Sequence, residues 1–355
     1  MSKIMEINGR KIGIQEPTYF IADVAANHDG SLDRAKRLIE LAKESGADAV
    51  KFQHFQAETI VSDKGFRDLG TSLAHQKQWK GSVFDVYRAA EFPWEWTSPL
   101  KEFSDQIGID FFTAPYSLDL IDQVNEFIPA FKVGSGDVNW HESIRRMCSF
   151  GKPVIVATGA STFSDVSNAV NVLREENASF SIMQCNTNYT GQIDNISYSN
   201  LNVLNKYAEY FPDAILGLSD HTPGHVTVLG AISLGARLIE KHFTDDVTRN
   251  GPDHKFSMTP KTWRMMVEDS RLLESALGDG IKKIEINEEE AGIVQRRSIR
   301  YASNLKKGHL LTREDLVVLR PAPIDSLPPN LLGDVIGKIL NKNVEKHDVV
   351  SMTQL

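Results

Sequence analysis

Short apolar runs alternate with longer amphipathic segments along most of the chain. Runs rich in Val, Ile and Phe favour buried strands, whereas apolar positions spaced three and four apart favour helices, as in Ser31–Ser45. The predicted strands are Thr18–Ala25, Ala49–His54, Asp110–Pro115, Phe131–Asp137, Pro153–Gly159, Phe180–Asn186, Ala214–His221 and Arg237–Thr244. Eight such alternations are more typical of an α/β fold of the (β/α)8 TIM-barrel type than of an open doubly wound sheet.

Two segments depart from this alternation. Thr59–Glu91 is long and polar, contains His75 and Trp79, and is predicted to be an inserted loop that acts as a lid. Lys282–Glu290 is highly charged and lacks an apolar period, which is typical of a linker. We therefore expect a catalytic barrel over residues 1–281, a linker over 282–290, and a small domain of short strands and turns over 291–355.

Composition narrows the class of function. Lys and Arg number 39 against 47 Asp and Glu, a net charge of −8, which argues against nucleic acid as the main partner. The two cysteines, Cys148 and Cys185, form no CxxC pair, so neither a disulfide framework nor a thiolate zinc site is expected. The N-terminus has no apolar core of signal-peptide length, and no apolar run is long enough to span a membrane. These features predict a soluble, cytoplasmic protein.

Polar residues gather where the predicted strands end. The carboxyl ends of barrel strands carry the active site in this type of fold, and an unpaired buried charge costs several kcal/mol. Seven of the eight runs nevertheless carry polar or charged residues there, which favours a functional site over packing. These residues are Asp23, Asn27, His28, Lys51, Gln53, Thr113, Lys132, Ser135, Asp137, Asn186 to Tyr189, Ser219 to His221, and Glu240 to His242.

Two histidines indicate a site for a divalent metal, and two lysines indicate a site for a small anion. His221 and His242 end consecutive strands, which lie about 5 Å apart when paired, so both imidazoles can reach one ion. Without thiolates, Mn²⁺ or Mg²⁺ is favoured over a closed zinc site. Lys51 and Lys132, with the hydroxyls of Ser135 and Ser219, could hold a phosphate and a carboxylate. Neither a P-loop nor a GxGxxG motif is present, so a small anion such as phosphoenolpyruvate fits better than a nucleotide.

Six ordered motifs resemble the sialic acid (N-acetylneuraminate) synthase family. They are Ile21–Gly30 (IADVAANHDG), Gly46–Gln53 (GADAVKFQ), Phe131–Asp137 (FKVGSGD), Gly217–His221 (GLSDH), Glu240–Thr244 (EKHFT) and Gly251–His254 (GPDH). The C-terminal segment, with Arg297-Ser298 and Leu319-Arg320-Pro321, is similar to the antifreeze-like (SAF) domain of that family. The resemblance covers almost the whole chain.

The resemblance implies an enzyme that condenses phosphoenolpyruvate with an open-chain N-acetylated amino sugar. The sugar would be N-acetylmannosamine or a 2,4-diacetamido hexose, and the products a nine-carbon 2-keto-3-deoxy sugar acid and phosphate. It implies that His221 and His242 hold a divalent metal, Mn²⁺ first and Mg²⁺ or Co²⁺ as alternatives, and that Asp23 is catalytic. The residues implied to bind substrates are Lys51, Thr113, Lys132, Ser135 and Ser219 for phosphoenolpyruvate, and Gln53, Asp137, Tyr189, Asp253 and Arg320 for the sugar. Arg320 would act across a domain-swapped homodimer.

Three departures from the family pattern bear on the substrate. Asp23 stands where the family has Glu, Thr113-Ala114 replaces Ser-Thr, and Thr187 and Thr190 replace Asn and Pro. We interpret them as altered substrate choice, toward legionaminate, pseudaminate or a spore-coat sugar acid. Two other classes remain open: a metal-dependent aldolase or hydrolase on the same barrel, and a sugar-acid binder without activity.

Overall fold

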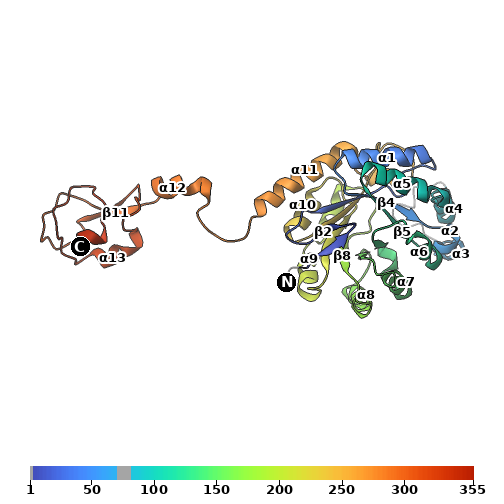
Figure 1. The fold of residues 1–355 in the computed structure, drawn as a ribbon, viewed down its shortest axis with the longest axis horizontal. Helices are drawn as coiled ribbons and strands as arrows, with labels where there is room; N and C mark the ends of the chain where they lie inside the picture. The colour runs from blue at the N-terminus through green and yellow to red at the C-terminus, as the bar shows by residue number, and fades with distance from the viewer. Residues whose placement is uncertain (1–2, 70–80) are drawn as a thin grey trace. The chain divides into compact units, whose positions relative to one another are not determined.

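The computed structural model describes residues 3–69 and 81–355. The chain divides into two compact units, Met1–Gly278 and Asp279–Leu355, which are described separately here (Figure 1). Within the described part of the chain, no helix is long and apolar enough to cross a membrane. The two cysteines are buried and unpaired.

The first unit is an eight-stranded parallel barrel, which confirms the fold predicted from the sequence. Its strands are β3 (Tyr19–Asp23), β4 (Ala49–His54), β5 (Asp110–Pro115), β6 (Phe131–Val133), β7 (Val154–Ala157), β8 (Phe180–Cys185), β9 (Ile215–Asp220) and β10 (Leu238–His242). The order in the sheet is β5-β4-β3-β10-β9-β8-β7-β6. The two ends, β5 and β6, lie beside each other without a continuous ladder, so the barrel is nearly closed. Each strand falls within the corresponding predicted run.

Helices follow the strands and surround the sheet (Figure 1). They are α1 (Leu32–Glu44), α5 (Thr97–Ile107), α6 (Leu118–Val124), α7 (His141–Cys148), α8 (Phe163–Glu175), α9 (Val203–Tyr210), α10 (Val226–Ser233) and α11 (Pro260–Leu277). The sequence encodes several of their ends. Ser31 caps α1 by accepting a hydrogen bond from the Arg34 amide, and Thr259 precedes Pro260 at the start of α11.

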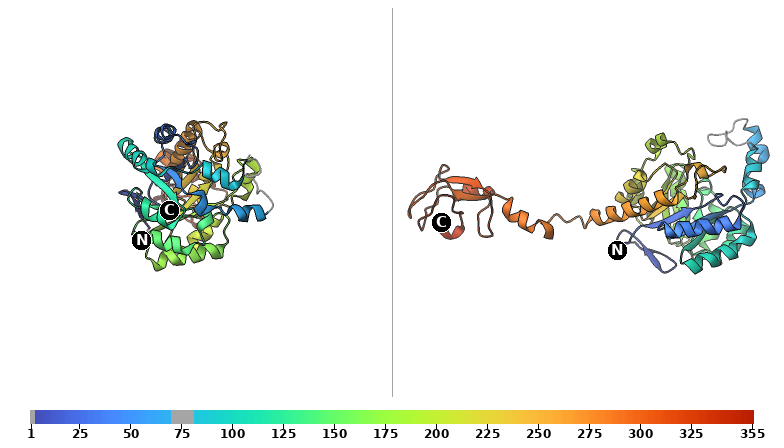
Figure 2. Two further views of the ribbon diagram at one scale, coloured as in Figure 1. Left: turned by 90° about the vertical axis from the view of Figure 1, so that its right-hand side faces the viewer. Right: turned by 90° about the horizontal axis from the view of Figure 1, so that it is seen from above.

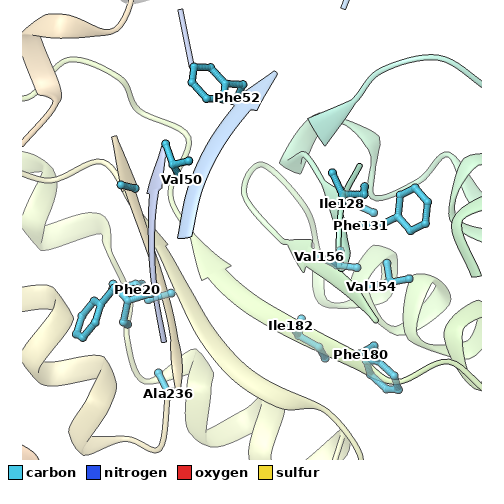
Figure 3. Packing of buried hydrophobic residues seen from close by; sticks show 14 of the residues in the cluster. Phe20, Val50, Phe52, Ile128, Phe131, Val154, Val156, Phe180, Ile182 and Ala236 are labelled. Atoms are coloured by element: carbon cyan, nitrogen blue, oxygen red, sulfur yellow. The ribbon is translucent and has the colours of Figure 1, made fainter. Parts of the chain in front are cut away.

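Side chains alternate between the outer and inner faces along each strand, and they form two apolar layers. Outward residues such as Val154, Phe180 and Ile182 pack between the strands and the helices (Figure 3). Inward residues at the amino ends of the strands, among them Tyr19 and Leu238, pack with the hairpin β1 (Met5–Ile7) and β2 (Arg10–Ile12). The hairpin therefore closes the end of the barrel opposite α3 and α4 (Figure 2). The carboxyl end is left for polar side chains.

The long β4–α5 connection holds α2 (Ala57–Ile60), α3 (Asp63–Asp68) and α4 (Val83–Ala89). An inserted segment was predicted here, although not its helices. The part that contains His75 and Trp79, which the lid prediction also invoked, lies outside the described residues.

The second unit contains short strands and turns. A short helix, α12 (Glu289–Val294), precedes the antiparallel pair β11 (Ser298–Tyr301) and β12 (Leu316–Leu319), and α13 (Leu332–Val335) follows. The unit has its own core, which includes Ile299, Tyr301, Leu316, Val344 and Val350. The segment proposed as a linker, residues 282–290, includes the first residues of α12.

Candidate active site

Strand register brings the charged residues of the sequence together inside the barrel. His242 pairs with Asp23, Asp23 pairs with Lys51, and Glu240 pairs with Ser219 across neighbouring strands. Since alternate residues of a strand face the same side, Asp23, Lys51, Ser219, Glu240 and His242 share the inner face with the apolar layer below them. Lys132 reaches the same place from β6.

These groups form a buried network of charges. Lys51 Nζ donates to Asp23 Oδ2 at 2.7 Å and lies 3.6 Å from Glu240 Oε2. Lys132 Nζ lies 3.4 Å from Glu240 Oε1, which also accepts from Ser219 Oγ at 3.1 Å. All four charged side chains are 5% exposed or less, so each needs these partners.

Burial and neighbouring charges shift the pKa values of these four groups in opposite directions. Burial disfavours the anion, yet Lys132 and Lys51 lower the pKa of Glu240 to about 2. Burial also raises the pKa of Asp23 in spite of Lys51, and it lowers the pKa of Lys132. The pKa of Lys51 is raised because Asp23 and Glu240 outweigh its burial. Glu240 is thus the firmly ionised carboxylate between two lysines.

The two histidines lie beside this network. Their ring centroids are 5.4 Å apart, and Tyr189 packs its ring 4.3 Å from that of His221. Burial lowers the pKa of His221 to about 4, with help from His242, and burial and Lys51 lower that of His242 to about 3. Both imidazoles are therefore neutral near pH 7, the form in which histidine binds metals.

The free nitrogens of the two rings fit a metal. His221 Nδ1 donates to the Asn186 carbonyl at 2.9 Å, which leaves Nε2 with the lone pair. His242 Nδ1 is buried with no hydrogen-bond partner among the described residues. In residues 3–69 and 81–355, no group of three or more His, Cys, Asp and Glu side chains is arranged to bind a metal. These two imidazoles would hold an ion only with water or substrate oxygens as further ligands.

A cavity of about 530 Å³ opens beside the network. Gln53, which donates to Asp23 Oδ2 at 3.3 Å, connects the two. The predicted site residues that line the cavity are Gln53, Ser135, Asp137, Tyr189, His242 and Asp253. Asp253 Oδ2 accepts from the Ala26 amide at 3.1 Å, and burial raises the pKa of Asp253 to about 7.

Two predicted site residues do not join this group. Thr113 lies on the outer side of β5, where its hydroxyl is 2.6 Å from His54 Nδ1. Its neighbour Phe112 belongs to the inner layer, so alternation turns Thr113 toward the helices. Arg320 belongs to the second unit, where it is exposed directly after β12.

The sequence analysis placed Glu240 among the polar residues at the strand ends but assigned it no role, and it did not select Cys185. Glu240 is two residues before His242, so the period of a strand was a sufficient signal that both face inward. Cys185 Sγ lies 3.9 Å from His221 Nδ1, and burial raises its pKa to about 11, which makes it an unreactive thiol. Asp220 and Lys241, at the same strand ends, instead pair with each other on the outer side of the sheet.

Comparison with known proteins agrees with the fold and with the family resemblance of the sequence motifs. The NeuB family model matches residues 38–282, and the SAF domain model matches residues 296–355. The N,N'-diacetyllegionaminic acid synthase of Campylobacter jejuni is 31% identical, over 94% of this chain and 98% of its own length. The N-acetylneuraminate-9-phosphate synthase of Homo sapiens is 31% identical, over 96% of this chain and 94% of its own.

A solved structure extends this likeness to three dimensions. The N-acetylneuraminic acid synthetase of Leptospira borgpetersenii is 27% identical and superimposes with a TM-score of 0.71, covering 82% of this chain and 95% of that one. The protein is an α/β-barrel enzyme with a C-terminal SAF domain. It belongs to the NeuB family.

Proposed function

We propose that this protein condenses phosphoenolpyruvate with an open-chain N-acetylated amino sugar, giving a nine-carbon 2-keto-3-deoxy sugar acid and phosphate. The observation that carries the proposal is the pair of buried lysines, Lys51 and Lys132, next to a cavity lined by amide, hydroxyl and carboxyl groups. Ammonium groups bind phosphate and carboxylate strongly in such a partly dry site. The names of the relatives support the same class of reaction.

The two substrates have separate places in this proposal. Lys51, Lys132, Ser135 and Ser219 bind phosphoenolpyruvate at the inner strand ends. Gln53, Asp137, Tyr189 and Asp253 bind the sugar in the cavity. Arg320 of the partner subunit completes the sugar site in a homodimer.

The reaction forms a C–C bond and replaces the C2–O bond to phosphate by a C2–O bond to the oxygen of water. C3 of phosphoenolpyruvate attacks the aldehyde carbon of the sugar, and the aldehyde oxygen becomes a hydroxyl. A water molecule adds to C2, the C2–O bond to phosphate breaks, and a ketone remains. The two protons of the water end on the new hydroxyl and on the phosphate.

The side chains would guide these protons and hold the substrates. Asp23, which Lys51 and Gln53 keep in place, accepts a proton from the attacking water. His221 and His242 would hold Mn²⁺, with Mg²⁺ or Co²⁺ as alternatives, and the bound ion would supply Lewis-acid polarisation of the aldehyde.

The test is phosphate release with a panel of 2-acetamido and 2,4-diacetamido hexoses, with product mass as a second readout. We expect release only when phosphoenolpyruvate, a sugar and a divalent metal are all present, with loss of activity in EDTA and recovery with Mn²⁺. Full activity of the metal-free protein would contradict the metal role. Sugar cleavage without any need for phosphoenolpyruvate would instead indicate an aldolase.

A further inference from the structure

The turn that follows Asp253 has one buried side chain that the site does not use. The β10–α11 connection forms a short 3-10 turn, η5 (His254–Phe256), directly after Asp253. Asp253 lines the cavity, and Phe256 packs its ring 5.0 Å from that of His242. His254 is fully buried and is not one of the described residues that line the cavity. Its contacts must therefore be sought on the other side of the turn.

Both ring nitrogens of His254 have partners there. Nε2 lies 2.8 Å from Asp29 Oδ1, and Nδ1 lies 2.8 Å from Thr244 Oγ1. Burial alone would raise the pKa of Asp29, but hydrogen bonds from His254 and Arg249 lower it below its ordinary value. Asp29 is thus ionised and can only accept, so His254 Nε2 carries a proton and donates it to the carboxylate.

Asp29, His254 and Thr244 are the residue types of a nucleophilic triad, but they lack access to a substrate. A nucleophile must contact the atom that it attacks. Thr244 and His254 are both fully buried, so no substrate reaches the hydroxyl of Thr244. This arrangement favours a structural link over a second reactive centre.

The link joins two connections at the carboxyl end of the barrel. Asp29 lies in the β3–α1 connection, and His254 lies in the β10–α11 connection. Gly251 makes room for the contact, because a β-carbon there would lie 2.6 Å from His254 Cδ2. A second bond joins the same two connections, since the Ala26 amide donates to Asp253 Oδ2 at 3.1 Å. Asp253 is thus held through its own carboxyl group and through its neighbour.

We propose that His254 is a positioning residue, whose hydrogen bond to Asp29 holds the η5 turn so that the Asp253 carboxyl stays on the Ala26 amide and faces the amino sugar. The inference rests on the proposed function, which assigns Asp253 to the sugar. A carboxyl group that is ordered before the substrate arrives loses less entropy on binding. Loss of the link should therefore weaken sugar binding and leave phosphoenolpyruvate binding unchanged.

Two substitutions of His254 differ in the bond to Asp29. Gln places a nitrogen near the position of Nε2, so His254→Gln should keep this bond, whereas the shorter side chain of His254→Asn should lose it. We expect KM for the sugar to rise about tenfold in His254→Asn and about twofold or less in His254→Gln. KM for phosphoenolpyruvate should stay within about twofold of wild type in both.

His225→Asn is the control for these two variants. His225 Nε2 lies 2.8 Å from Asp269 Oδ2, a histidine–aspartate pair of the same length that does not line the cavity. The control should change neither KM. An unchanged KM for the sugar in His254→Asn, or equal rises in KM for both substrates, would overturn the inference.

A double-mutant cycle tests whether His254 acts through Asp253. Asp253→Asn alone should raise KM for the sugar. His254→Asn should then add less than about twofold, because the group that His254 positions has already been changed. A further tenfold rise would show that His254 acts through other residues and would contradict the proposed role.

Amide hydrogen exchange followed by NMR separates this inference from the proposed function. The Ala26 amide should exchange about tenfold faster in His254→Asn than in wild type or His254→Gln, whether or not the protein turns over a sugar. Amides of β8 should keep their wild-type rates. Unchanged exchange at Ala26, or faster exchange throughout the barrel, would overturn the positioning role. Faster exchange at Ala26 alone, in a protein whose wild type releases no phosphate with any sugar, would support that role and overturn the proposed reaction.

Discussion

Of the two lysines in the proposed phosphoenolpyruvate site, Lys132 is the better one to replace, because Glu240 keeps Lys51 at 3.6 Å when Lys132 is removed. Lys51 donates to buried Asp23, so its loss would also leave that carboxylate unpaired. Lys132 instead lies near Glu240 and donates to the carbonyl of Val133 at 3.1 Å. Lys132→Gln should raise KM for phosphoenolpyruvate about 10- to 150-fold, since a charge-assisted hydrogen bond contributes roughly 1.5–3 kcal/mol.

Steady-state kinetics with each substrate varied in turn checks this prediction. KM for the sugar should change much less than KM for phosphoenolpyruvate. Lys101→Gln, on the surface of α5, is the control and should change neither. An unchanged KM for phosphoenolpyruvate in Lys132→Gln would place the anion elsewhere.

Single residues also show how far sequence reasoning extends. Asp23, Lys51, Lys132, Ser219, His221 and His242 were placed at one end of the barrel because strand ends share an edge, and the structure brings them together. Thr113 was predicted to bind phosphoenolpyruvate because it lies near the end of a strand. Side chains alternate along β5, however, and Thr113 faces outward toward His54. The sequence could not predict where Arg320 lies relative to the barrel site, because Arg320 belongs to the second unit.

At the scale of elements, a buried ion pair of Asp220 and Lys241 joins β9 and β10 on the outer side of the sheet. Thr222 and Thr227 also donate to the Asp220 carboxylate, and Lys241 donates to the Thr222 carbonyl at 2.7 Å. Lys241→Met should destabilise the barrel by about 3–5 kcal/mol, because it leaves a buried carboxylate without its cation.

Thermal and denaturant unfolding of the full chain measure this loss. Lys206→Met removes an exposed partner of Glu209 and is the matched control, with an expected cost of about 0–1 kcal/mol. Similar losses in the two variants would show that the buried pair has no special role in stability.

The barrel strands were the part of the structure that the sequence predicted best. All eight barrel strands were expected within a few residues, because parallel strands covered on both faces form continuous apolar runs. The helices α2, α3 and α4 were not expected, since they are short and their segment is mostly polar. Short helices of this kind depend on capping residues such as Ser62 and Ser82 and on packing against the barrel.

At the scale of the whole molecule, the proposed homodimer shares each sugar site between two chains. Arg320→Ala and His221→Ala subunits should each be inactive or nearly so, because each lacks one part of every site. Mixing them should restore activity, since each heterodimer contains one site with both residues intact. Random exchange predicts recovery to about one quarter of the wild-type activity.

Mass measurement of the mixed oligomers must verify subunit exchange in that experiment. A mixture of Arg320→Ala with Arg320→Ala carrying a different tag is the control and should stay inactive. No recovery after verified exchange would show that Arg320 serves the barrel of its own chain or no barrel.

The most direct measurement follows the bridging oxygen of phosphoenolpyruvate through the reaction. The proposed condensation breaks the bond between C2 and that oxygen, and water supplies the ketone oxygen of the product. With the bridging oxygen labelled as ¹⁸O, mass spectrometry should find the label in the phosphate, in an amount equal to the sugar acid formed. Label retained in the sugar acid at early times, or a sugar acid formed without phosphate, would contradict the proposed reaction.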